Sequence, residues 1–94
     1  MVNLKDILDA VIDLTLDSSD ATIYVHHGLI FPVVDYRMEG NILHLINFRS
    51  NDFLEDIISL QELITYIAVE GFEIEEVQLD IKDFEIIDER ILLY

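Results

Sequence analysis

Cysteine is absent from this chain of 94 residues. Disulfides and thiolate metal sites are therefore excluded, and a reducing compartment is permitted. Basic residues are scarce, with five lysines and arginines against twenty aspartates and glutamates, which gives a formal net charge of −15. Because this charge would repel a phosphate backbone and five cations displace few counterions, we expect no direct binding of nucleic acid.

The N-terminus also lacks the apolar run of a signal peptide or a membrane span. Its apolar residues are interrupted by Asp6, Asp9 and Asp13. Such a segment is too polar to serve as an export signal or to cross a bilayer. We therefore expect a cytoplasmic protein that does not bind a membrane.

The recurrent motifs of enzymes are missing as well. The chain has no glycine-rich phosphate loop and no Gly-x-Ser-x-Gly nucleophile turn. Its many carboxylates do not by themselves make a catalytic pair, which needs two carboxylates in different environments within one pocket. We expect no catalytic residue, no enzyme activity and no cofactor.

Three histidines are the residues most able to bind a metal. His26 and His27 are neighbours in an expected strand, so their side chains point to opposite faces and cannot chelate together. His44, in a later strand, could join one of them and a carboxylate around a zinc or nickel ion. A hydrogen-bonded strand histidine is the more common case, so we expect no metal site and keep a metal-dependent enzyme as a distant alternative.

Apolar residues, in contrast, are abundant at 52% of the sequence. Acidic chains that remain disordered are poor in such residues. We therefore expect one folded domain over residues 1–94, of modest stability because a short chain buries a small share of its surface. Salt should stabilise the monomer by screening the repulsion among its excess negative charges.

The first half of the chain predicts a helix followed by three strands. Asn3 can cap a helix that runs to about Leu16. Its buried stripe, at helical spacing, would comprise Leu4, Ile7 or Leu8, Val11 and Leu14. Alternating patterns predict strands at residues 22–26, 30–38 and 42–48. A turn at Gly40 joins the last two, and Pro32 restricts its strand to an edge or a bulge.

The second half predicts a long helix followed by more strands. The helix would cover residues 52–69, and Gly71 would end it. A second capping box, which begins at Ser59, leaves a kink or a restart open. After Gly71 the apolar period changes to two, which predicts a bulged strand or two strands, and then a final hairpin at residues 84–87 and 91–94.

Together these elements predict an α+β fold in the order α-βββ-α-ββ(β), with two helices packed on one face of a mainly antiparallel sheet.

The two halves of the chain, 1–48 and 49–94, also resemble each other. The matching fragments are Leu4–Leu8 with Leu54–Ile58, Asp35–Met38 with Asp83–Ile86, and Ile42–Leu43 with Ile91–Leu92. An internal duplication would explain this likeness, and so would the ordinary propensities of any helix-plus-hairpin protein.

The strongest candidate for a functional surface is electrostatic, because residues 1–47 carry a net charge of −5 and residues 48–94 a net charge of −10. Our candidate partner-binding residues are nine carboxylates: Glu70, Glu73, Glu75, Glu76, Asp80, Asp83, Glu85, Asp88 and Glu89. On one sheet face they would lie about 7 Å apart along a strand and about 5 Å apart across strands. Successive phosphates of a nucleic acid lie about 7 Å apart, by our estimate from duplex geometry. Such a row could compete for a nucleic-acid-binding groove.

A secondary acidic face is expected on the first helix. Asp6, Asp9, Asp13 and Asp17 are spaced three, four and four residues apart, which stacks them along one exposed line. For this line the alternative is an ordinary solvated helix face. For the nine carboxylates the alternative is charge that prevents edge pairing and aggregation.

In size, charge, helix-plus-meander pattern and absence of catalytic motifs, the whole chain resembles the small acidic orphan proteins of bacteriophages and mobile elements. Some of these, including anti-CRISPR and anti-restriction proteins, act by mimicking nucleic acid. The resemblance rests on no motif, so it assigns no residue a role. It implies a viral inhibitor that acts in the host cytoplasm on a nucleic-acid-processing enzyme.

We therefore expect a binding protein that blocks the nucleic-acid-binding groove of a basic host protein. Charge steering would make the association fast and salt-sensitive. An immunity protein or antitoxin against a basic toxin would need the same electrostatics. A homo-oligomeric structural or assembly protein, for example a homodimer, is a third alternative, because the apolar segment Ile91–Tyr94 could supply an edge strand for pairing.

Overall fold

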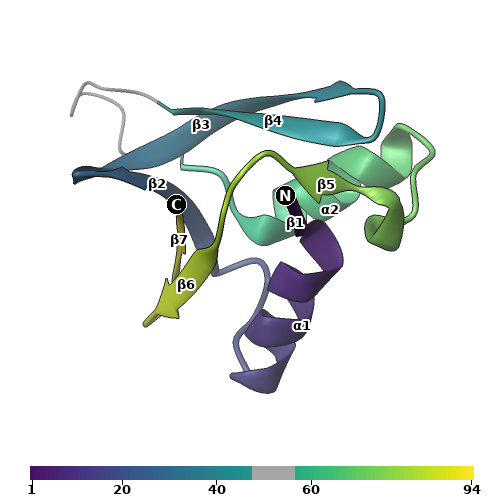
Figure 1. Ribbon diagram of the computed structural model, residues 1–94. Helices are drawn as coiled ribbons and strands as arrows, with labels where there is room; N and C mark the ends of the chain where they lie inside the picture. The colour runs from purple at the N-terminus through teal and green to yellow at the C-terminus, as the bar shows by residue number, and fades with distance from the viewer. Residues whose placement is uncertain (48–56) are drawn as a thin grey trace.

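The computed structural model describes residues 1–47 and 57–94, which form two helices and a curled sheet of seven strands (Figure 1). The expected α+β class is confirmed. In chain order the elements are β1 (Val2–Asn3), α1 (Leu4–Asp13), β2 (Thr22–His27), β3 (Leu29–Glu39), β4 (Ile42–Asn47), α2 (Leu60–Val69), the 3₁₀ helix η2 (Ile74–Glu76), β5 (Gln78–Leu79), β6 (Phe84–Ile87) and β7 (Arg90–Leu93). This order agrees broadly with the one predicted from the sequence.

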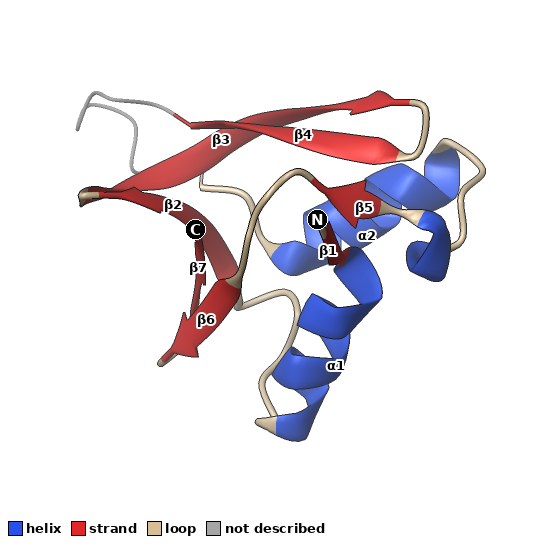
Figure 2. Ribbon diagram, viewed as in Figure 1, coloured by secondary structure: helices blue, strands red, loops and turns tan. Residues whose placement is uncertain are grey.

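The sheet is mixed but mainly antiparallel, in the order β1-β5-β4-β3-β2-β7-β6 (Figure 2). The β2–β3–β4 meander of the first half forms its centre. Strands of the second half flank this meander on both sides, with β5 parallel to β4 and β7 parallel to β2. Residues 80–83, which connect β5 to β6, therefore run from one side of the curl to the other.

Both helices pack against the sheet and complete one hydrophobic core. Its helical members are Leu4, Ile7 and Val11 of α1 and Leu60, Leu63 and Ile67 of α2. Its members from the strands include Ile23, Val25, Val33, Leu43, Leu79, Ile91 and Leu93. Leu14, which the helical spacing assigned to the buried stripe, is instead 53% exposed.

The exposure of Leu14 follows from where α1 ends. The helix begins as expected, with the Asn3 side chain accepting a hydrogen bond from the backbone of the first turn at 2.8 Å. It ends at Asp13 instead of near Leu16, because Thr15 adopts a left-handed backbone conformation with a φ of 56°. The N–H groups of Thr15 and Leu16 then donate to the carbonyls of the last helical turn, which is a Schellman motif.

Thr15→Gly is expected to stabilise the protein. The left-handed conformation costs a residue with a Cβ atom about 1–2 kcal/mol, and glycine adopts it without that cost. Part of this gain is lost because glycine has greater conformational freedom in the unfolded chain. We therefore expect the free energy of unfolding to increase by about 1 kcal/mol, which calorimetry would record as a rise in Tm of about 4–8 °C. Thr15→Ala keeps the Cβ atom and should not raise Tm. Equal Tm values for the two variants would contradict the argument.

α2 starts at Leu60, so the helix is not continuous through Ser59: residues 57 and 58 are not helical, and the start at Ser59 that the second capping box left open is the one observed. Ile58 is extended, because its N–H donates to β3 and its carbonyl accepts from β2, both at 3.0 Å. A residue whose backbone is bonded to two strands cannot also join a helix. The Ser59 hydroxyl caps α2 instead, by accepting a hydrogen bond from the first turn at 3.2 Å. The start predicted at Asp52 lies outside the described residues.

The strand expected directly after Gly71 is a turn of 3₁₀ helix, η2. The Glu76 carboxylate accepts a hydrogen bond from the Glu73 N–H at 3.1 Å, and the Glu76 N–H donates to the Glu73 carbonyl at 3.0 Å. These bonds close a single turn, so the alternating Phe72 and Ile74 do not form a strand. The rest of the period-two pattern, Val77 to Ile81, forms the two-residue strand β5, and Ile81 lies in the connection to β6.

The hairpins form as predicted. Gly40 supplies a φ of 63° between β3 and β4, and Asp88 supplies a φ of 56° between β6 and β7. Among the described residues Pro32 pairs with β2, and it precedes a bulge between Val33 and Asp35, which agrees with the restriction to an edge or a bulge.

The last strand does not offer an edge, so the expectation for the segment Ile91–Tyr94 is wrong. β7 pairs with β6 on one side and with β2 on the other, and β6 lies at this end of the sheet.

The internal duplication of the two halves stays a prediction. The β3–β4 and β6–β7 hairpins match it, whereas Leu54–Asp56 lies outside the described residues and Ile57–Ile58 precedes α2.

A pair of tyrosines joins β3 to α2. The rings of Tyr36 and Tyr66 meet edge to face, with their centroids 4.6 Å apart. Burial, and after it the Glu62 carboxylate, raises the pKa of Tyr36 above its ordinary value of 10.0. The folded state therefore favours the neutral phenol.

Tyr36→Phe is expected to reduce the loss of stability at alkaline pH. Because the folded-state pKa is raised, the stability linked to this phenol is fully present below pH 10.0 and is lost as the pH rises through the raised pKa. Urea unfolding of the parent and the variant between about pH 9 and pH 12 measures this slope. A variant that loses stability as steeply as the parent would speak against the linkage.

Candidate functional site

Four of the nine candidate carboxylates gather where α2 ends and η2 begins. Glu70 follows the last helical residue, Glu73 precedes η2, and Glu75 and Glu76 lie within it, all with exposed side chains. Two asparagine amides fix the backbone here. Those of Asn3 and Asn41 donate to the carbonyls of Glu75 and Glu76 at 2.7 and 3.1 Å. This group of carboxylates is therefore held on an anchored turn rather than on a loose loop.

Four more carboxylates gather at the β6–β7 hairpin. Asp83 precedes β6, Glu85 lies within it, and Asp88 and Glu89 form the turn. The Tyr94 hydroxyl donates to a Glu85 carboxylate oxygen at 2.8 Å, and this bond is the main reason why the pKa of Tyr94 is raised. Glu85 is therefore held in place by the C-terminal residue.

The expected row of nine carboxylates along one sheet face is wrong. Glu85 is the one member that lies within a strand, and Asp80 stands apart in the connection between β5 and β6. The reason is local. The acidic residues occupy the turns and caps of the second half, where the chain reverses, so they cannot follow the period of a strand.

The secondary acidic face is shorter than expected. Asp6, Asp9 and Asp13 lie exposed on α1. Asp17 lies beyond the end of the helix, where its carboxylate accepts hydrogen bonds from the Ser19 hydroxyl at 2.7 Å and the Ser19 N–H at 2.9 Å. These bonds lower the pKa of Asp17. The line on α1 therefore has three aspartates.

α1 brings the two groups of the second half into one neighbourhood. The helix contacts η2 and also contacts β6, and in Figure 1 it lies between them. We call the exposed carboxylates of α1, of η2 and its N-cap residue, of β6 and of the β6–β7 turn the acidic band, which comprises Glu73, Glu75, Glu76, Asp6, Asp9, Asp13, Glu85, Asp88 and Glu89. No local pattern in the sequence predicts this adjacency, because it depends on contacts between opposite ends of the chain.

No direct ion pair among the described residues neutralises the band. Within residues 1–47 and 57–94 the one ion pair joins His44 to Glu39 at 3.3 Å, outside the band. The Arg90 guanidinium lies over the Tyr24 ring, 5.8 Å from its centroid, rather than against a carboxylate. The band therefore keeps its negative charge on the surface of the fold.

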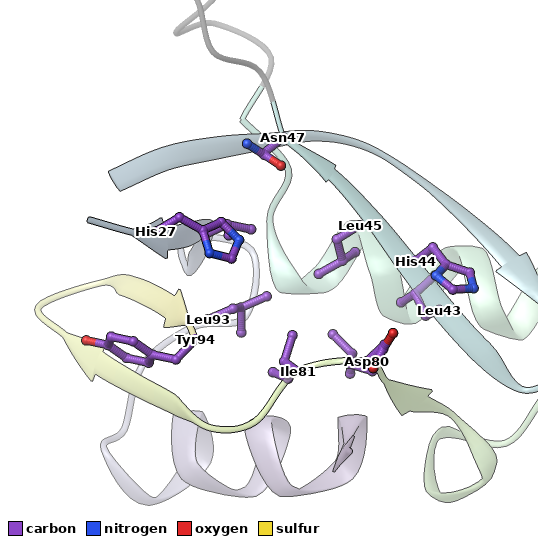
Figure 3. Close-up of a pocket in the computed structure, with 11 residues that line it drawn as sticks. His27, Leu43, His44, Leu45, Asn47, Asp80, Ile81, Leu93 and Tyr94 are labelled. Atoms are coloured by element: carbon purple, nitrogen blue, oxygen red, sulfur yellow. The ribbon is translucent and has the colours of Figure 1, made fainter. Parts of the chain in front are cut away.

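A pocket opens at the mouth of the curled sheet (Figure 3). Its volume is about 180 Å³, and its walls come from β2, β4, the end of β5, the connection to β6, the end of β7 and Tyr94. The lining residues are Val25, His27, Leu43, His44, Leu45, Asn47, Leu79, Asp80, Ile81, Leu93 and Tyr94. Asp80, one of the nine candidate carboxylates, thus belongs to this pocket and not to the acidic band.

The three histidines do not converge. His26 contacts the Tyr94 ring with centroids 5.1 Å apart, His27 lines the pocket, and His44 pairs with Glu39. In the part of the chain that the structure describes, no three side chains of metal-ligating type are close enough to hold an ion.

Neither the helices nor a comparison with known proteins adds a functional assignment. α1 and α2 have ten residues each, and no helix among the described residues is long and apolar enough to cross a membrane. The chain matches no protein-family model, no curated protein and no solved structure.

Proposed function

We propose that this protein is a binding protein that uses its acidic band to occupy the basic nucleic-acid-binding groove of another protein. One observation carries the proposal. Nine exposed carboxylates lie on α1, on η2 and its N-cap, on β6 and on the β6–β7 turn, α1 contacts both η2 and β6, and no described lysine or arginine is paired with these carboxylates. Such a surface attracts a basic partner over a long range and orients it before contact.

The charge density is of the right magnitude for a mimic of a duplex. The longest extent of the molecule is 33 Å, and the chain carries a formal charge of −15. A DNA duplex of that length carries about 19 phosphate charges. A groove that has evolved to bind a duplex would therefore meet a comparable charge on a body of comparable length.

The mimicry is of total charge and not of phosphate spacing. Evenly spaced carboxylates would require the strand row that the fold does not form. Affinity for a groove would then come mainly from steering and from the displacement of counterions, with specificity supplied by a smaller number of contacts. In a phage or mobile element, such a protein would inhibit a host enzyme.

Two alternatives share part of this argument. An immunity protein against a basic toxin would use the same acidic band, and the identity of the captured partner separates the two functions. A homo-oligomeric assembly protein loses the feature that favoured it, because β7 is paired on both sides.

Capture from a bacterial lysate tests the proposal. The immobilised protein is incubated with lysate at about 0.1 M and about 1 M salt, where charges interact over about 10 Å and about 3 Å. We expect the low-salt fraction to contain a nucleic-acid-binding protein that the high-salt fraction lacks. The purified partner should then release a fluorescent oligonucleotide when this protein is added. A partner that still binds its oligonucleotide in the presence of excess protein would refute groove blocking.

A further inference from the structure

The pocket at the mouth of the sheet has a size that restricts its occupant. Its volume is about 180 Å³. A cavity of about 150 Å³ holds a molecule of benzene, whereas pockets for drug-sized ligands have volumes of about 300–1,000 Å³. The pocket is therefore suited to one side chain or a group of that size and is too small for a nucleotide or a larger cofactor.

The chemistry of the walls is that of a site for a long cationic side chain. Six lining residues are aliphatic: Val25, Leu43, Leu45, Leu79, Ile81 and Leu93. Asp80 and Asn47 supply side-chain oxygen acceptors, and Figure 3 shows them on opposite sides of the pocket. No lysine or arginine is among the lining residues. The pocket thus offers apolar walls for methylene groups together with a carboxylate and an amide for a charged head group.

We propose that this pocket binds an arginine side chain of the basic partner, an inference that rests on the proposed function. The methylene groups of arginine would cover the aliphatic walls while its guanidinium reaches Asp80. Lysine fits less well, because its ammonium is a compact and strongly hydrated charge without the planar fork that uses several acceptors. An anionic ligand is disfavoured, because the net charge of −15 on the protein would repel it.

The acidic band and the pocket would affect different rates of binding. Exposed surface charges mainly increase the rate of association, whereas a residue anchored in a desolvated pocket slows dissociation. Arginine is among the residues that most often provide such anchors. The pocket would therefore supply the specificity that an acidic surface alone does not give.

The test is a titration of the protein with two short peptides, followed by NMR of its backbone amides. The peptides are acetyl-Gly-Arg-Gly-amide and the same peptide with citrulline, whose urea has the shape of the guanidinium without its charge. We expect the arginine peptide to bind with a Kd of about 1 mM, with the largest shifts at Leu45, Asp80 and Ile81, and the citrulline peptide to bind at least about tenfold more weakly.

Three variants make the test specific. Asp80→Asn should weaken binding of the arginine peptide about tenfold, and Ile81→Trp should weaken it similarly by filling the pocket without a change of charge. Glu70→Gln removes the same charge at the end of α2, outside the pocket lining, and should leave the affinity unchanged. The inference is overturned if the two peptides bind equally well, if Asp80→Asn has no effect, or if the shifts map to the acidic band.

This outcome is separable from that of the proposed function. If the arginine peptide does not bind while the protein still releases the oligonucleotide from its partner, only the pocket inference fails. If the peptide binds the pocket but no partner groove is blocked, the pocket remains a guanidinium site and the proposed function fails.

Discussion

Reversal of two carboxylates of the acidic band, in the variant Glu73→Lys/Glu75→Lys, is expected to weaken binding of the captured partner at least about 100-fold at about 0.1 M salt. Both side chains are exposed on the turn that Asn3 and Asn41 anchor, so the substitution changes charge without removing core packing. Close charge pairs across an interface contribute about 1.5 kcal/mol or more each, and reversal replaces attraction by repulsion. Two such pairs account for the expected loss.

Glu76 is left unchanged in this variant, because its carboxylate closes the η2 turn. The matched control is Asp35→Lys/Glu62→Lys, which alters the net charge by the same amount at two exposed sites near Tyr36, outside the acidic band. We expect this control to weaken binding by less than about tenfold, through the net charge alone. Surface plasmon resonance at several salt concentrations measures both. If the two variants lose affinity equally, total charge and not the acidic band determines binding.

Local signals in the sequence predicted much of the fold. The cap at Asn3, the turn at Gly40 and the final hairpin each depend on a few neighbouring residues, and all three form as expected. The errors arise where a distant contact overrides a local pattern. The helix expected from about Asp52 does not include Ile58, because the backbone of that residue bonds to β2 and β3.

For the candidate site, too, local features could be predicted from the sequence and features that depend on distant contacts could not. That the second half is rich in carboxylates can be read directly, and the structure places the nine candidate carboxylates at turns, caps, connections and one strand. Their arrangement could not be predicted, because it depends on how α1 packs between η2 and β6. The pocket was missed for the same reason. Leu43, Asp80 and Leu93 come from three distant parts of the chain, and no spacing in the sequence relates them.

Truncation of the core under the acidic band is expected to have the largest effect on stability. Ile7→Ala should lower the free energy of unfolding by about 2–5 kcal/mol, because Ile7 is 1% exposed and its removal leaves a cavity between α1 and the sheet. For a domain of 94 residues, the whole stability is about 5–14 kcal/mol, and the repulsion among its carboxylates reduces it further. The variant is therefore expected to be close to unfolding at 37 °C.

The control for Ile7→Ala is the same substitution on the same helix. Ile12 is 58% exposed, and alanine is the better helix former, so Ile12→Ala should change the free energy of unfolding by less than about 0.5 kcal/mol. Urea unfolding at pH 7 measures both variants. Similar losses would show that α1 does not bury the face described here. A large difference would show that this face fixes the helix carrying Asp6, Asp9 and Asp13, so that the charge on α1 is presented by a rigid support.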